Sequence, residues 1–380
     1  MKRILSLAIA ALTCLSALGG PPLDEILPVR GLAIEAPSRR GLDDFIHFIE
    51  EDLAPANFNL LILRVDWNFA YESHPELRDS DPLTKQDVLR LVAACKAHGI
   101  ELVPHINLLG HQSWAKKIGA LLREYPQFDE TPSVKTENYE KWPNEDGLYC
   151  KSYCPLHPEV HDVVLPLIDE LCDAFEADYF HAGMDEVFYI GMDECPRCKG
   201  HDRAELFAGE VTLLRNHLAE KGRKLMIWGD RLLDGTVTGL GEWEASTNGT
   251  APAIDLIPRD VFICDWHYER AELTGVYFAL KGLSVAECGY RDADICEQQI
   301  RDMIRFRNQV SKETAKRLTG YIHTIWSGSG AFLRRYNAIT RGEDDPRHRN
   351  ASREGQEARS DDVKAFIHIA EVLKNLTNPG

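Results

Sequence analysis

The stretch Phe180-His181-Ala182-Gly183-Met184-Asp185-Glu186-Val187 joins an apolar run to two adjacent acids. The run is aromatic and small and follows an amphipathic segment, so it is predicted to be a core strand. Carboxylates at the end of a core strand lose solvation, which costs free energy. Their position therefore indicates a functional role. Strands of this kind end at the open rim of a barrel of alternating strands and helices, where acid–base chemistry takes place. The stretch therefore predicts such a barrel, with Asp185 and Glu186 at its rim.

The rest of the chain alternates strand-like and helical segments. Helical periodicity separates most of the strands and is clearest at residues 42–53, 85–98, 160–175, 205–221 and 295–309. Gly99, Gly222 and Gly282 each follow a helical segment and precede a strand, as C-cap glycines do. The pattern predicts a (β/α)8 TIM barrel that forms a single domain over residues 25–337. Its eight strands are expected at residues 31–36, 60–65, 101–108, 179–183, 224–228, 261–266, 284–288 and 320–326.

A doubly wound open sheet is the alternative architecture for such an alternation. It requires a glycine-rich phosphate loop after the first strand, and Pro37-Ser38-Arg39-Arg40 is not one. Two insertions, at residues 127–158 and 233–258, carry aromatic residues and are expected to project from the rim. Residues 338–380 begin as a charged segment and end in a predicted helix at 361–376, which we expect to pack on the outside of the barrel.

The first 19 residues have the character of a signal peptide. A short basic start precedes an apolar run from Ile4 to Leu18, and Ala17-Leu18-Gly19 has the small residues of a cleavage site. Cys14 is the alternative, as a lipid-attachment residue, but Ala11 and Thr13 fit that signal poorly. We therefore expect a protein exported to the periplasm or the exterior, without a membrane span.

The composition restricts the partners. The formal net charge is −17, from 43 basic and 60 acidic residues, and no basic stripe interleaved with aromatics is visible. Nucleic acid and anionic membrane surfaces are therefore not expected to bind.

Four of the ten cysteines lie in polar loop sequence, as Cys150-x3-Cys154 and Cys195-x2-Cys198. They are expected to form either two disulfides or one four-thiolate zinc site, with a structural role in both cases. No cofactor and no catalytic metal are expected.

Aromatic residues stand at or just after the ends of the last four predicted strands: Trp228, Trp266 with Tyr268, Tyr290 and Trp326. Aromatic faces stack on the apolar faces of pyranose rings, so a ring of aromatics beside carboxylates is typical of a sugar pocket. Arg39, just past the first strand, adds a donor fork suited to vicinal hydroxyls.

From about Arg30 to Trp326 the sequence resembles glycoside hydrolase family 20, the β-N-acetylhexosaminidase family. The segment from Arg30 to Arg39 resembles the family's first strand and its sugar-binding arginine, and Leu109-Gly110-His111 resembles its Pro-Gly-His. His181-Ala182-Gly183-Met184-Asp185-Glu186 resembles its His-x-Gly-Gly-Asp-Glu motif. The tryptophans at 228, 266 and 326 stand where the family has its pocket tryptophans, and His111 is expected to bind substrate.

The resemblance implies retaining, substrate-assisted release of terminal N-acetylhexosamine (GlcNAc or GalNAc) from a β-linked glycan, with the 2-acetamido group of the substrate as nucleophile. Glu186 is then the general acid and base, and Asp185 accepts the acetamido N–H. Repulsion between the two acids is expected to raise one pKa, which favours Glu186 as the protonated group. Tyr290 is preferred over Tyr268 as the donor to the acetamido oxygen, because the family uses a tyrosine of strand seven.

The sequence also departs from the family pattern. His105 and Asn107 replace the acids that precede Pro-Gly-His, so the carboxylates that orient His111 are expected to be missing. Ser327-Gly328 replaces the acid after the last tryptophan. The alternative function is a non-catalytic glycan-binding protein on the same barrel. Such a protein does not require the acid pair, so the presence of both Asp185 and Glu186 argues against it. A third hypothesis, hydrolysis at a four-cysteine zinc centre, is opposed by the absence of an open metal position.

Overall fold

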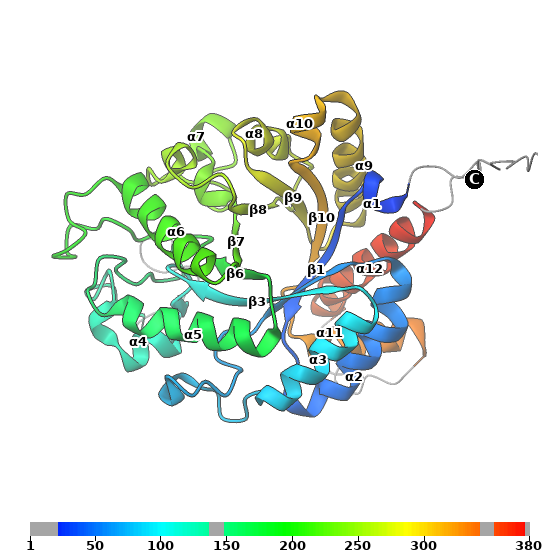
Figure 1. Cartoon of the computed structure of the whole chain (residues 1–380), viewed down its shortest axis with the longest axis horizontal. Coiled ribbons are helices and arrows are strands. Elements are labelled where there is room, and N and C mark those ends of the chain that lie inside the picture. The colour runs from blue at the N-terminus through cyan, green and yellow to red at the C-terminus, as the bar shows by residue number, and fades with distance from the viewer. Residues whose placement is uncertain (1–21, 137–147, 343–352, 377–380) are drawn as a thin grey trace, which may run out of the picture.

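Eight parallel strands close into a barrel in the computed structural model, which describes residues 22–136, 148–342 and 353–376 (Figure 1). Around the barrel the strand order is β1-β10-β9-β8-β7-β6-β3-β2. The predicted TIM barrel is therefore confirmed. The strands are β1 (Val29–Glu35), β2 (Leu60–Arg64), β3 (Glu101–Leu108), β6 (Tyr179–Gly183), β7 (Lys224–Trp228), β8 (Phe262–Trp266), β9 (Ser284–Gly289) and β10 (Leu318–Thr324).

Helices surround the barrel, and a short hairpin lies in the loop that follows β3, ahead of the first insertion. The hairpin consists of β4 (Ser113–Trp114) and β5 (Lys117–Ile118). The main helices are α2 (Leu42–Phe48), α3 (Lys85–Ala97), α5 (Val160–Phe175), α6 (Arg203–Glu220), α8 (Thr274–Leu280), α9 (Ala293–Gln309), α11 (Ser329–Thr340) and α12 (Arg353–Asn375). Short helical turns complete the set: α1 (Leu23–Ile26), α4 (Ala120–Glu124), α7 (Gly235–Thr238) and α10 (Lys312–Ala315).

Local sequence sets where these helices begin and end. Thr84 and Asp87 form a reciprocal capping box at the start of α3, and Asp292 accepts two backbone N–H groups at the start of α9. The three predicted C-cap glycines, at 99, 222 and 282, have φ of 65°, 74° and 89°. These left-handed angles let the chain turn from a helix into the next strand without a Cβ clash.

The core has two layers. A large cluster fills the space between the strands and the helices, and a smaller one fills the barrel interior. The interior cluster includes Ile62, Val103, Met226 and Trp228, with Trp326 packed against it from the rim side. The interior of the barrel is therefore filled with side chains, and the carboxyl ends of its strands are the place where such barrels form their sites.

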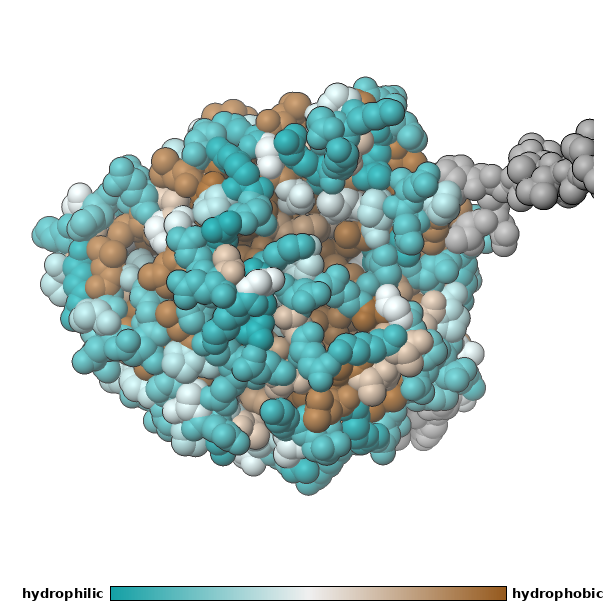
Figure 2. All heavy atoms as spheres, viewed as in Figure 1, coloured by the Kyte–Doolittle hydropathy of each residue, from teal (hydrophilic) through white to brown (hydrophobic). Residues whose placement is uncertain are grey.

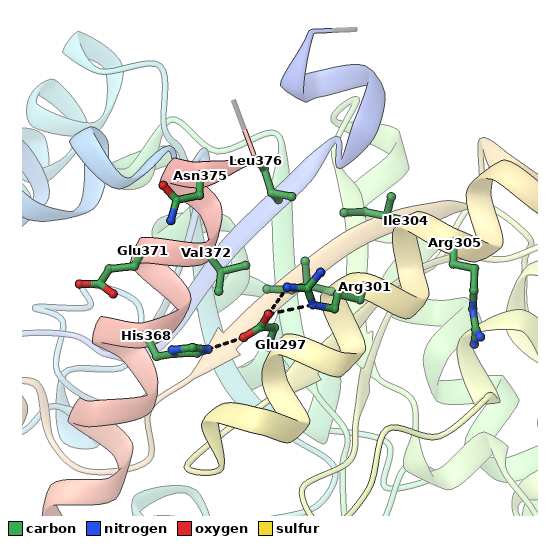
Figure 3. Close-up of a pocket in the computed structure, with 10 residues that line it drawn as sticks. Glu297, Arg301, Ile304, Arg305, His368, Glu371, Val372, Asn375 and Leu376 are labelled. Carbon is green, nitrogen blue, oxygen red and sulfur yellow. Dashed lines mark hydrogen bonds and ion pairs between the residues drawn. The ribbon is translucent and has the colours of Figure 1, made fainter. Parts of the chain in front are cut away.

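The C-terminal helix α12 packs on the outside of the barrel against α9 and α11 (Figure 1). In the groove between α9 and α12, Glu297 accepts from Arg301 on its own helix and lies 2.5 Å from His368 Nε2 on α12 (Figure 3). Nearer the rim, Asp362 of α12 accepts from Ser327 Oγ, just after Trp326. The helix thus supports the segment that carries the last rim tryptophan.

Hydrophilic residues cover most of the face seen in Figure 2, with smaller hydrophobic areas between them. This pattern suits helices whose apolar sides face a barrel. Among the described residues, no helix has the length and hydropathy needed to cross a membrane. The predicted signal peptide, residues 1–19, lies outside the described part of the chain.

Candidate active site

The acid pair lies on a constrained turn immediately after β6. Gly183, Met184 and Glu186 have φ of 68°, 67° and 48°, so two non-glycine residues adopt left-handed backbone within four positions. Such conformations are costly and cluster at functional sites, where the surrounding structure holds them. Asp185 and Glu186 are each only 7% exposed. The turn therefore presents two buried carboxylates at the carboxyl-terminal rim.

The loop after β3 places His111 between the two acids. His111 Nε2 lies 3.0 Å from Asp185 Oδ2 and 3.1 Å from Glu186 Oε2. The two loops touch through their backbones, because a Cβ on Gly110 would lie 2.6 Å from the Asp185 carbonyl oxygen. Leu109 and His111 have φ of 60° and 54°, so this loop is held in left-handed backbone as well. Only glycine at position 110 permits this approach.

The charges of this triad shift its pKa values in opposite directions. Burial by itself would lower the pKa of His111, but the Asp185 charge and the hydrogen bonds to Asp185 and Glu186 raise it well above 6.5. Burial would raise the pKa of Asp185, yet the charge and hydrogen bond of His111 hold it below 3.8. At neutral pH His111 is therefore protonated and Asp185 is ionised. Asp185 Oδ1 is buried and has no hydrogen-bond partner among the described residues.

The raised pKa of His111 predicts how stability depends on pH. In the folded protein His111 keeps a proton that the unfolded chain releases near pH 6.5. Its contribution to the free energy of unfolding is therefore complete below pH 6.5 and is lost as the pH rises through the pKa of the folded state. We expect the free energy of unfolding, measured with urea from pH 6 to pH 9, to fall more steeply for the parent than for His111→Gln. His267, whose pKa is raised to about 10 mainly by Asp265 against the effect of burial, adds the same slope to both proteins. Equal slopes would contradict the assignment.

A further carboxylate, Asp66, lies in the cavity just after β2. Asn107 donates to it from its backbone N (2.8 Å) and from Nδ2 (3.1 Å). Burial raises the pKa of Asp66, against the opposing charge of Arg64 and the hydrogen bonds from Asn107. Asp66 contacts Asn107 rather than His111, so the absence of acids ahead of Leu109-Gly110-His111 stays a prediction.

Another buried carboxylate, Asp230, lies beneath the acid pair and was not found from the sequence. Asp230 accepts from Glu186 N (2.9 Å), Trp266 Nε1 (3.3 Å) and Arg231 Nε (2.7 Å), and the side chains of Asp230 and Arg231 are fully buried. Burial outweighs the opposing charge of Arg231 and raises the pKa of Asp230 to about 6. An Asp-Arg pair two residues past the end of a core strand was the available signal, by the same argument that identified Asp185.

The site opens into a cavity of about 880 Å³ at the rim. One wall consists of Trp266, Tyr268 and Trp326. Within this wall Trp326 Nε1 donates to the Tyr268 hydroxyl at 2.8 Å. Arg64, the last residue of β2, lies with its guanidinium 5.3 Å from the Trp326 ring centroid. The other polar groups along the cavity include Asp66, Asn107, His111, Ser113, Asp185, Glu186, Glu244, Glu269 and Arg270.

The two insertions also contribute to the cavity. Tyr149 and Trp243 line it, stacked at 5.4 Å between ring centroids, together with Trp114 from the hairpin that precedes the first insertion. The insertions therefore do reach the rim, as their aromatic content predicted. Tyr153 of the first insertion is buried instead and donates to Glu210, and Trp142 lies outside the described residues.

Three expected pocket residues lie elsewhere. Arg39 is half-exposed on the turn before α2, where its guanidinium pairs with Asp81 and Asp87, and Arg64 occupies the cavity in its place. Trp228 is 0% exposed inside the barrel beneath Trp326, at 5.7 Å between ring centroids. Tyr290 lies behind Tyr268, at 5.4 Å, and does not line the cavity.

The cysteines do not form the expected set of four. Cys154, Cys195 and Cys198 lie together with Glu130, whereas Cys150 lies beside His111 and Glu186. The Cys150 thiol donates to the Glu186 carbonyl oxygen at 3.4 Å. A four-thiolate site is therefore ruled out by position, because Cys150 supports the acid pair from behind.

A closed parallel barrel with a buried carboxylate pair and aromatic walls at its carboxyl-terminal rim defines a (β/α)8-barrel protein with an acid–base site for a ligand that stacks on aromatic rings. Residues 67–290 match the model of the glycosyl hydrolase family 20 catalytic domain, and the chain belongs to this family.

Relatives and solved structures agree with this assignment. The chain is 29% identical to a beta-hexosaminidase of Akkermansia muciniphila over 193 residues, which cover 45% of this chain and 37% of the relative. It is 24% identical to a lacto-N-biosidase of Bifidobacterium bifidum, over 50% of this chain and 16% of that protein. The chain thus spans well under half the length of these relatives.

The fold is similar to a crystal structure of a beta-N-acetylhexosaminidase, with a TM-score of 0.60 and 20% identity over 90% of this chain and 76% of that one. A chitobiase of Flavobacterium johnsoniae also gives 0.60, with 19% identity over 92% and 52% of the two chains.

Proposed function

We propose that this protein is an exported glycoside hydrolase that releases terminal β-linked N-acetylhexosamine by a retaining, substrate-assisted mechanism. The observation that carries the proposal is the asymmetry of Asp185. Its Oδ2 is held by protonated His111, while its buried Oδ1 has no hydrogen-bond partner in the described part of the chain. An ionised oxygen without a donor, beside a second carboxyl group, fits the N–H of a substrate amide.

Each group then has a defined task. The acetamido N–H donates to Asp185 Oδ1, which turns the amide oxygen toward the anomeric carbon. That oxygen forms the bond to the anomeric carbon and closes a cationic oxazolinium ring, whose charge Asp185 balances. Glu186 gives its proton to the departing glycosidic oxygen. It then takes a proton from the water that opens the ring, so configuration is retained.

We infer the remaining substrate contacts from the side chains of the cavity walls. The faces of Trp266 and Trp326 suit stacking on a pyranose ring. Tyr268, held through Trp326, replaces Tyr290 as the phenol nearest the acetamido oxygen. Arg64, fixed by Glu35 at 3.0 Å, replaces Arg39 as the donor to ring hydroxyls.

A panel of aryl β-glycosides tests the function. We expect turnover of aryl N-acetylglucosaminides or N-acetylgalactosaminides and no comparable turnover of the plain glucosides, because these lack the internal nucleophile. Equal cleavage of the plain glucosides would move the nucleophile to a protein carboxylate such as Glu244, which lines the cavity and accepts from His267 and Tyr268. Binding of the N-acetylated sugars without turnover would support a glycan-binding protein instead.

Export is tested separately from activity. The intact mass of the protein recovered outside the cytoplasm should lack the first 19 residues. Recovery of the uncleaved chain in the cytoplasm would contradict export and leave the reaction untouched.

A further inference from the structure

Three thiols and one carboxylate converge in a buried cluster outside the catalytic cavity. Cys154 Sγ lies 3.3 Å from Cys198 Sγ and 3.4 Å from Cys195 Sγ. These sulfurs and a carboxylate oxygen of Glu130 all lie within 4.8 Å of one another, and all four residues are buried. The segments that supply them are far apart in sequence, so the barrel loops bring the cluster together.

One carboxylate of this cluster is poorly satisfied. Glu130 Oε1 accepts from Met192 N at 3.0 Å, whereas Oε2 is buried and has no nitrogen or oxygen donor among the described residues; the Cys195 and Cys198 thiols are the groups that face this carboxylate. Thiols are weak donors, so they compensate the burial of a carboxylate poorly. A cation at the place where the three sulfurs meet would neutralise the carboxylate and bind the sulfurs at the same time.

A disulfide does not meet this requirement. Three sulfurs allow one disulfide at most, which leaves the third thiol unpaired and brings no cation to the Glu130 carboxylate. The sulfur–sulfur distances are well beyond the length of a disulfide bond. They approach about 3.8 Å, which is the distance between two sulfur ligands of a tetrahedral zinc ion with zinc–sulfur bonds of about 2.3 Å.

We propose that Glu130, Cys154, Cys195 and Cys198 hold a structural zinc ion. The Cys195-Pro-Arg-Cys198 spacing is that of zinc-binding turns, and the backbone N–H of Cys198 points at Cys195 Sγ at 3.5 Å, as a hydrogen bond to a ligand sulfur does. With four protein ligands the coordination is closed, so the ion has no open position for chemistry.

The position of the cluster gives the ion its role. Glu130 and Cys154 belong to the insertion after β3, where Glu130 N donates to Ser152 O at 3.1 Å. Cys195 and Cys198 belong to the segment that runs from Glu186 to α6. Four residues before Cys154, Cys150 contacts the Glu186 carbonyl oxygen. A zinc ion here joins the two loops that flank the acid pair and fixes the backbone behind it.

Metal content of the purified full-length protein tests the proposal without reference to activity. After dialysis against metal-free buffer, elemental analysis should find one zinc per chain. Cys198→Ser and Glu130→Gln should lose most of it, while Cys95→Ala, which changes a buried thiol on α3 away from the cluster, should keep it. Equal zinc in all four proteins would overturn the assignment.

X-ray absorption at the zinc edge of the parent protein keeps the test decisive if the variants fail to fold. Three sulfurs at about 2.3 Å and one oxygen at about 2.0–2.2 Å are expected. A shell dominated by nitrogen and oxygen would place the ion at His111, Cys150 and Glu186, which also lie within 4.8 Å of one another, and would overturn the proposal. So would a metal-free protein in which peptide mapping finds Cys154 in a disulfide.

Discussion

Glu186→Gln is expected to lower kcat/KM by roughly 10²- to 10⁴-fold for N-acetylhexosaminides with poor leaving groups, which is what general-acid assistance contributes. The loss should shrink toward aryl glycosides whose phenolate is already stable, because such a group departs without a proton. A series of aryl N-acetylglucosaminides of graded phenol acidity measures this as a steeper dependence of rate on leaving group in the variant. The amide keeps the volume of the carboxyl group, so the buried turn should survive.

Asp185→Asn is the matched comparison on the same turn. Here good and poor leaving groups should slow alike, because the acetamido nucleophile loses its orienting acceptor in both cases. An N-acetylglucosamine thiazoline, which imitates the cyclised intermediate, should inhibit the parent and bind Asp185→Asn much more weakly. If both variants showed the same dependence on leaving group, the division of tasks between the two acids would be wrong.

Trp228→Ala and Trp326→Ala are expected to fail in different ways, although both residues were predicted to line the pocket. Trp228 is fully buried and lies 4.5 Å from His181 between ring centroids, so its loss should lower the free energy of unfolding by about 3–5 kcal/mol. Trp326 lines the cavity, and its loss should remove about 2–4 kcal/mol of transition-state stabilisation, roughly 30- to 1,000-fold in kcat/KM.

Urea unfolding and kcat/KM, measured on both variants, separate the two roles. Trp326→Ala should unfold near the denaturant midpoint of the parent, because the ring packs on the barrel interior from one side only. A loss of stability in Trp326→Ala as large as that in Trp228→Ala, with kcat/KM unchanged, would show that Trp326 is a core residue and does not hold the sugar.

The register of the strands explains why two tryptophans at strand ends differ. Trp228 pairs with Cys264, which lies two residues before Trp266 on β8. Trp266 therefore stands nearer the rim than Trp228, although each ends its strand. Trp326 follows the end of β10 by two residues and lies at the cavity. The sequence marks a strand end but not its height in the barrel, which the shear between neighbouring strands sets.

The sequence by itself determined the barrel, its eight strands and the place of the acid pair. These follow from local causes: apolar runs of strand length, helical periodicity, capping residues such as Thr84, and the C-cap glycines. Asp185 and Glu186 stood out because two carboxylates end a core strand, and this signal lies within one segment.

Only the tertiary structure decided which distant residues meet. Arg64 occupies the cavity because it ends β2, whereas the chain after β1 turns outward and carries Arg39 to Asp81 and Asp87. Glu130 joins three cysteines in place of Cys150 because the loop after β3 and the segment before α6 meet at these side chains. Such contacts depend on the paths of loops between strands, which many weak interactions fix together, and no pattern in one segment of sequence records the position of another.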